Sequence, residues 1–226
     1  MIQMRRITVI PDFMQIRVMA PQAAAAAVSW WLSGGISAAN AIAVYQPKGA
    51  ASLAASYINL ANPGTYNAAP GVAPTWASGT GWTFNGSTQY LSTGLNQADN
   101  MTVLIRVSDW ASGSCFGSRG NPRLFFTYFS ALVMRYHWGE NSLDATYRAS
   151  GVYALAKNIA YYNGATDGTV SGTFDFSLFH PMYIGAFDRS NSADDFASAK
   201  IQALAIYDTP LTAPQVLAVS TAAALL

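Results

Sequence analysis

Side chains able to catalyse hydrolysis are few in this sequence and lie far apart along it. Glu140 is the only glutamate, and its neighbours Gly139 and Asn141 predict a loop. Retaining glycoside hydrolysis requires two carboxylates about 5–5.5 Å apart, and no acidic residues alternate along an expected strand. A Ser-His-Asp triad has only His137 and His180 to draw on, and the G-x-S-x-G motif that presents such a serine is absent. The sequence therefore predicts a protein without catalytic activity.

His137 has a structural interpretation that we favour over catalysis. Within the sequence MRYHW, Arg135 and His137 fall on one face, because side chains alternate along a strand. Met134, Tyr136 and Trp138 fall on the other face. We therefore expect a strand whose outer face is polar and whose inner face enters a core.

Composition limits the partners that this chain can bind. Only 10% of its 226 residues are charged, 51% are hydrophobic, and the net charge is +1. Such a balance gives no electrostatic basis for binding nucleic acid. No apolar run approaches 18 residues, so no membrane insertion is predicted. Cys115 is the only cysteine, which excludes an intrachain disulfide, and we expect it to be a buried, inert thiol.

The first 38 residues differ in composition and sequence pattern from the rest of the chain. Residues 22–33 are rich in alanine and stop before Gly34-Gly35, which predicts a short helix after an extended segment. Pro11 and the polar residues Asp12, Gln15 and Arg17 interrupt the apolar residues of the preceding segment, so no secretory signal is predicted. We expect residues 1–38 to form an arm and residues 39–226 to form a separate domain.

From residue 39 onward, short runs of β-forming residues are separated by turn residues at a spacing of about 8–12 residues. The run 101–110 alternates most regularly, with one face made of Met101, Val103, Ile105 and Val107. Near the end, Thr212 and Gln215 form a capping box that predicts a helix over residues 213–224. The predicted fold class is all-β, an antiparallel β-sandwich with a short helix near each end.

Four stretches in order resemble the motifs of laminin-G-like jelly rolls, which belong to the concanavalin A-like lectin/glucanase superfamily. They are Phe84-Asn85-Gly86 with Tyr90-Leu91, IAYYNG at 159–164, YIGAF at 183–187, and the closing run 196–216. The resemblance covers about residues 40–217 and implies a jelly roll. It also implies that Asn85-Gly86 forms the turn of a strand pair. Enzymes of this superfamily that resemble laminarinases carry two glutamates on one strand, and this chain lacks them.

Several relatives in this superfamily hold Ca²⁺ at the rim of the sandwich, through Asp, Asn and carbonyl oxygens. The loop after YIGAF offers such oxygens, on Asp188, Asn191, Asp194 and Asp195. No D-x-D-x-D spacing accompanies them, and a solvated loop with turn chemistry is the interpretation that we favour. We therefore expect no cofactor, with Ca²⁺ at this loop as the alternative.

A carbohydrate ligand is a further alternative that the fold leaves open. Sugars are held by aromatic faces that stack on C–H surfaces and by amides and charged groups that fix the hydroxyls. The candidate ligand-binding residues near strand ends or on the polar strand face are Trp110, Arg135, His137, Trp138, Tyr147 and Tyr162. Each aromatic among them is also a candidate core residue.

The main functional hypothesis from the sequence is a structural and interaction module, a component of a virion or another surface assembly. Free-standing laminin-G-like jelly rolls with short arms resemble decoration or attachment proteins of phage particles. The arm would anchor the domain to protein partners and to further copies of the chain, through Arg5, Arg6, Phe13, Trp30 and Trp31. The expected location is a virion or an extracellular surface. The alternative function is a lectin-like adhesion domain that binds a glycan.

Overall fold

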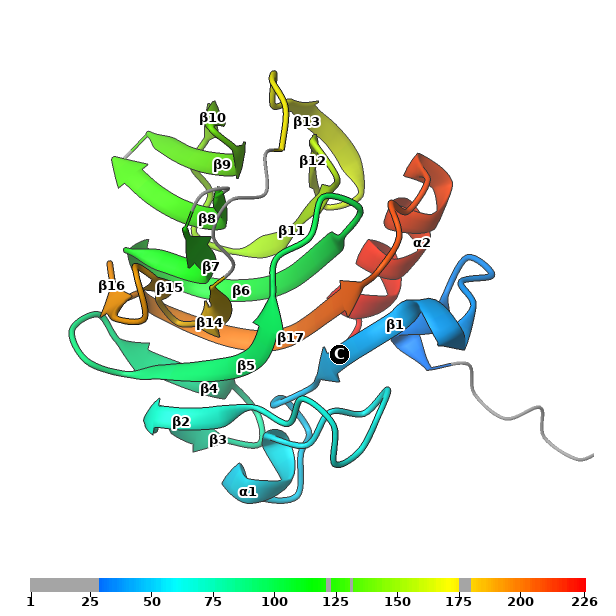
Figure 1. Ribbon diagram of the computed structural model, residues 1–226. Coiled ribbons are helices and arrows are strands. Elements are labelled where there is room, and N and C mark those ends of the chain that lie inside the picture. Colours follow the sequence, from blue (N-terminus) through cyan, green and yellow to red (C-terminus); the bar gives the residue numbers. More distant parts are fainter. Residues whose placement is uncertain (1–28, 121–122, 131, 175–179) are drawn as a thin grey trace, which may run out of the picture.

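Two antiparallel sheets packed face to face form the protein, as the sequence predicts (Figure 1). The structure is a computed structural model that describes residues 29–120, 123–130, 132–174 and 180–226. Pairing between the named strands is antiparallel throughout, except for one short parallel contact between β15 and β7. The fold class is therefore an antiparallel β-sandwich.

The first sheet is built around two long central strands. Its order is β13 (Ala165–Thr169), β12 (Ile159–Tyr162), β11 (Gly151–Ala156), β6 (Thr102–Ser112), β17 (Ser198–Tyr207), β4 (Gly81–Asn85) and β3 (Thr75–Ala77), and β1 (Ala41–Tyr45) also pairs with β17.

The second sheet lies opposite the first. Its order is β10 (Asn141–Thr146), β9 (Val133–Gly139), β8 (Arg123–Ser130), β7 (Ser114–Arg119), β14 (Pro181–Ile184), β5 (Tyr90–Asn96) and β2 (Ala69–Val72). The short strands β15 (Phe187–Asp188) and β16 (Ala193–Asp194) form a hairpin beside β7. The helical elements among the described residues are α1 (Leu53–Ser56), α2 (Ala213–Ala224) and the two 3₁₀ turns Trp30–Leu32 and Ala38–Asn40.

Strand β6 shows how alternation divides the apolar residues between two clusters. Met101, Val103, Ile105 and Val107 enter the core between the sheets, which confirms the face predicted for this run. Leu104 points the other way, into a second apolar cluster on the outer face of the first sheet. The sheet is thus buried on both faces.

Helix α2 covers that outer face (Figure 1). It begins as the capping box predicts, because the Gln215 side-chain oxygen accepts a hydrogen bond from the Thr212 N–H at 3.0 Å. Val216 and Val219 of the helix are fully buried. Arg106 of β6 ties down the helix end by donating to the carbonyl oxygens of Ala223 and Leu226. The C-terminal helix is therefore confirmed with the predicted bounds.

The Asn85-Gly86 turn differs from its predicted role as the turn of a strand pair. Strand β4 belongs to the first sheet and β5 to the second, so the chain crosses from one sheet to the other at this turn. The Asn85 side-chain oxygen accepts backbone N–H bonds from Ser87, Thr88 and Gln89. Phe84 is buried in the core, as expected. The turn is an arch between sheets, which a local sequence pattern cannot distinguish from a hairpin.

Strands β7, β8 and β9 are neighbours in the second sheet, and no helix covers their outer face in the part of the chain that the structure describes (Figure 1). Both helices lie away from these three strands in Figure 1. Among the described residues, no helix is long and apolar enough to cross a membrane. The strands β7 to β9 carry the side chains of the candidate site.

Candidate functional site

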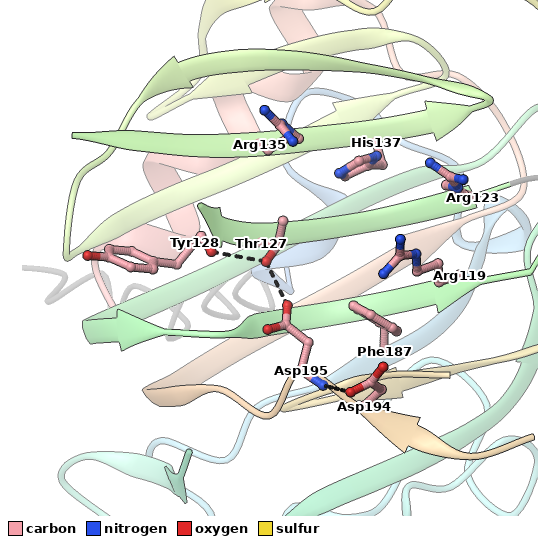
Figure 2. Close-up of a pocket in the computed structure, with 9 residues that line it drawn as sticks. All are labelled: Arg119, Arg123, Thr127, Tyr128, Arg135, His137, Phe187, Asp194 and Asp195. Carbon is pink, nitrogen blue, oxygen red and sulfur yellow. Dashed lines mark hydrogen bonds between the residues drawn. The ribbon is translucent and has the colours of Figure 1, made fainter. Parts of the chain in front are cut away.

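A cavity of about 420 Å³ lies on β7, β8 and β9 beside the β15–β16 hairpin. Its volume falls in the range of small-molecule pockets, about 300–1,000 Å³. Figure 2 shows Arg135, His137 and Arg123 along one side and Asp194 and Asp195 on the other. The nine lining residues are Arg119, Arg123, Thr127, Tyr128, Arg135, His137, Phe187, Asp194 and Asp195.

Strand alternation places the β9 side chains of this cavity. Arg135 and His137 line the cavity, whereas Met134, Tyr136 and Trp138 pack in the core between the sheets. The structure thus confirms the two faces that the sequence predicts for this strand. The inner residues hold the strand against the opposite sheet, which fixes the positions of the outer ones.

The carboxylate side of the cavity is held by defined hydrogen bonds. Asp195 Oδ2 accepts from Ser114 Oγ at 2.5 Å and from Thr127 Oγ1 at 2.8 Å. Asp194 accepts from Arg189 at 3.0 Å, and this hydrogen bond lowers the pKa of Asp194 below its usual value. Both carboxyl groups are therefore held in place as hydrogen-bond acceptors.

Arg135 is already engaged by a carboxylate. Asp144, on the neighbouring strand β10, sits opposite Arg135 in the strand register. The guanidinium donates two bonds to Asp144, one of them from Nη2 at 2.8 Å, and these bonds lower the Asp144 pKa and raise that of Arg135. This bidentate pair fixes the Arg135 side chain at the rim of the cavity.

His137 is a buried neutral group at the centre of this face. Its residue surface is 8% exposed. Burial in the first place, and then the positive charges of Arg123, Arg135 and Arg119, together lower its pKa from 6.5 to about 3. At neutral pH the imidazole is therefore uncharged, and it offers hydrogen bonding rather than charge.

Arg119 and Arg123 were not among the residues expected at a site. They are directly opposite each other on β7 and β8, and the Arg119 guanidinium lies 5.6 Å from the centre of the Phe187 ring. A signal is present in the sequence, because the turn-forming residues 120–122 separate the two arginines. A hairpin there would place both on one face.

The four loop residues considered for Ca²⁺ do not all lie at the same place in the structure. Asp194 and Asp195 line the cavity, whereas Asp188 and Asn191 do not. Asp188 is fully buried, and its Oδ1 accepts from the Asn191 N–H at 2.6 Å, as in the turn chemistry that we favoured. Among the described residues, no group of three or more His, Cys, Asp or Glu side chains is arranged to hold a metal ion.

The aromatic candidates do not gather at the cavity. Trp110 is 1% exposed and Trp138 is 4% exposed, so both are packed in the core, and Trp138 also lines a separate cavity beside Phe174. Strand alternation directs the Trp138 indole inward, whereas Trp110 turns inward after Asp109, whose φ of +51° interrupts the alternation of β6. Tyr147 is partly buried and donates its hydroxyl to the Trp110 carbonyl. The Tyr162 ring lies beneath the Arg148 guanidinium, with 4.1 Å between guanidinium carbon and ring centre.

Most of the expected arm lies outside the described residues, including Arg5, Arg6, Phe13 and the predicted helix up to residue 28. Trp30 and Trp31 are described, and Trp30 is buried in the cluster beneath α2. The Tyr207 hydroxyl donates to the Trp31 carbonyl at 2.8 Å. Trp30 therefore packs on its own domain. The roles of arm and assembly partners stay predictions.

No protein-family model matches this sequence, and a search of curated proteins gives no significant match. Solved structures do share its fold. A mutant of Trypanosoma rangeli sialidase with trans-sialidase activity aligns over 84% of this chain and 33% of its own, with a TM-score of 0.57 and 14% identity. The present chain thus spans about a third of the length of the sialidase chains that it matches.

Two further structures have similar scores. Domain 4 of AbnA, a GH43 extracellular arabinanase from Geobacillus stearothermophilus solved in complex with arabinotriose, has a TM-score of 0.55 and 16% identity, over 80% of this chain and 98% of that one. A structure of botulinum neurotoxin type C has a TM-score of 0.54 and 10% identity, over 82% of this chain and 52% of that one. Cell entry of that toxin is described as dependent upon interaction with two ganglioside molecules. These likenesses establish a β-sandwich fold. The laminin-G-like family and a virion role stay predictions.

Proposed function

We propose that this chain is a carbohydrate-binding domain whose ligand occupies the cavity on β7, β8 and β9. The observation that carries the proposal is the cavity itself, which combines arginine donors, a neutral imidazole and fixed carboxylate acceptors. Sugar hydroxyls both donate and accept hydrogen bonds, so a wall of donors facing a wall of acceptors suits them. The sheet holds these groups in place before a ligand arrives.

Similar folds support the same class of ligand. The arabinanase domain was solved with arabinotriose, and the neurotoxin is described as interacting with gangliosides. Because fold alone does not determine function, these likenesses support the ligand class, and the site must supply the rest. This proposal adopts the alternative function drawn from the sequence in preference to the virion hypothesis.

We propose that the domain binds without catalysis. A general base that operates near neutral pH needs a pKa close to 7, and that of His137 is lowered to about 3. A carboxyl that acts as a general acid needs a raised pKa, and that of Asp194 is lowered. The groups of the cavity therefore suit recognition of an unchanged sugar.

A glycan array tests the proposal. We expect the wild-type chain to bind a subset of glycans and the double variant Arg119→Ala/Arg123→Ala to lose that binding, because both side chains line the cavity. Lys200→Ala is the matched control, since it also removes a positive charge but pairs with Asp109 outside the cavity. An array without hits, or hits that survive the double substitution, would contradict the proposal.

A further inference from the structure

Two arginines face each other in the cavity, and neither is within ion-pair distance of a carboxylate among the described residues. Arg119 and Arg123 occupy opposing positions of the β7–β8 pair, where Cβ atoms are about 4.5–5.5 Å apart and like charges repel. Among the residues that the structure describes, the ion pairs to carboxylates are formed by Arg135, Arg148, Arg189 and Lys200, not by these two arginines. A bound anion would relieve the repulsion between them.

The other cations near the cavity are neutralised within the protein. Arg135 forms its bidentate pair with Asp144, and Arg189 is paired with Asp194 at 3.0 Å. His137 is uncharged at neutral pH, because burial first and then the positive charges of the surrounding arginines lower its pKa. Among the described residues that line the cavity, Arg119 and Arg123 are therefore the two cations outside the ion pairs, although the charge of Arg119 also acts on Asp194 across the cavity.

Two aromatic side chains line the cavity, and both are packed against other residues. Phe187 is 3% exposed and lies against Arg119, and the partly buried Tyr128 ring packs edge-on against Tyr147, with 4.8 Å between the ring centres. Affinity for a sugar must therefore come mainly from hydrogen bonds. The strongest of these are charge-assisted, and a guanidinium binds a carboxylate in a bidentate manner.

We infer that the cavity takes a glycan whose terminal sugar carries a carboxylate, with that carboxylate held between Arg119 and Arg123. The sugar hydroxyls then face Asp194 and Asp195 across the cavity. This inference rests on the proposed function and specifies the class of ligand that the site binds. A neutral sugar would leave the two arginines without a counter-charge, so the site discriminates by charge.

Calorimetric titration with matched acid and ester pairs tests the inference. The probes are two lactose-based trisaccharides that end in N-acetylneuraminic acid or in glucuronic acid, the methyl ester of each, and lactose. We expect at least one acid to bind, and its ester and lactose to bind at least about tenfold more weakly, because hydrogen bonds to charged groups are the stronger ones. Raising the salt concentration should weaken only the acid.

Variants locate the effect. Arg119→Gln and Arg123→Gln should each weaken binding of the acid by at least about tenfold, whereas Lys200→Gln, which removes a charge elsewhere, should leave it unchanged. Arg123→Lys keeps the positive charge but cannot form a bidentate hydrogen bond. Its affinity for the acid should therefore lie between that of the wild type and that of Arg123→Gln. Thermal unfolding of each variant shows whether the domain is still folded, and the ester comparison needs no substitution at all.

The outcomes separate this inference from the proposed function. An acid and its ester bound equally well, or neutral array glycans bound in preference to acidic ones, would overturn the carboxylate specificity and leave glycan binding intact. Absence of binding to every probe and every array glycan would overturn both.

Discussion

At the scale of single residues, His137 is a titratable group whose surroundings differ strongly from water. It sits on the outer face of β9, yet it is 8% exposed and lies in the field of three arginines. Both burial and like charge disfavour its protonated form. The folded protein thus keeps this imidazole neutral over a pH range in which the unfolded chain protonates it.

This difference predicts a pH dependence of stability. The folded pKa is about 3 and the ordinary value is 6.5, so the unfolded state binds the extra proton between these values. Stability linked to His137 is complete above pH 6.5 and declines as the pH falls toward 3. Between pH 7 and pH 5, the wild-type protein should lose about 2 kcal/mol of unfolding free energy through His137. The variant His137→Gln should lack this part of the loss. Urea titrations at both pH values check this, and parallel losses in the two proteins would contradict it.

At the scale of elements, the chain must cross from the first sheet to the second before it forms the strands that carry the candidate site. Strand β6 belongs to the first sheet and β7 to the second, and Gly113 lies between them with φ at +70°. A Cβ there would lie 2.0 Å from the Phe196 carbonyl oxygen. Glycine is required at this crossing both for its backbone angle and for the close approach.

A pair of glycine variants separates these two causes. Gly35 has a similar φ of +74°, but a Cβ there meets nothing within 4 Å. We expect Gly35→Ala to cost about 1 kcal/mol of unfolding free energy through its backbone angle. Gly113→Ala should cost at least about 2 kcal/mol more, because a steric clash is added. Denaturant unfolding measures both, and equal costs would show that the crossing has room for a side chain.

Sequence patterns predicted the features that depend on local alternation and capping. The faces of β6 and β9 and the bounds of α2 follow from side-chain period and from Thr212 and Gln215. The pattern could not predict the arch after Asn85, because hairpins and arches share the same turn residues. Nor could it separate core tryptophans such as Trp110 from surface ones.

The candidate site was predicted only in part, for a related reason. Arg135 and His137 follow from the alternation of one strand. Arg119 and Arg123 come from two other strands, and Asp195 comes from a distant loop. Strands β7, β8 and β9 pair in sequence order, which turn signals favour. The place of the β15–β16 hairpin beside β7 is a long-range feature, which local patterns do not predict.

At the scale of the whole molecule, the two sheets have different roles. The first sheet is buried on both faces, by the sandwich core and by the cluster under α2. The second sheet carries the cavity on its outer face. The packing of α2 and the proposed ligand site therefore lie on opposite sides of the sandwich, so the proposed ligand would bind without disturbing the core.

Mapping of backbone amide chemical shifts during titration with an array-selected glycan tests this account most directly. We expect the changes to concentrate on β7, β8, β9 and the β15–β16 hairpin, where the cavity lies, and to spare α2 and β11 on the other side. Changes centred on α2, or on the separate cavity beside Trp138 and Phe174, would contradict the assignment of the site.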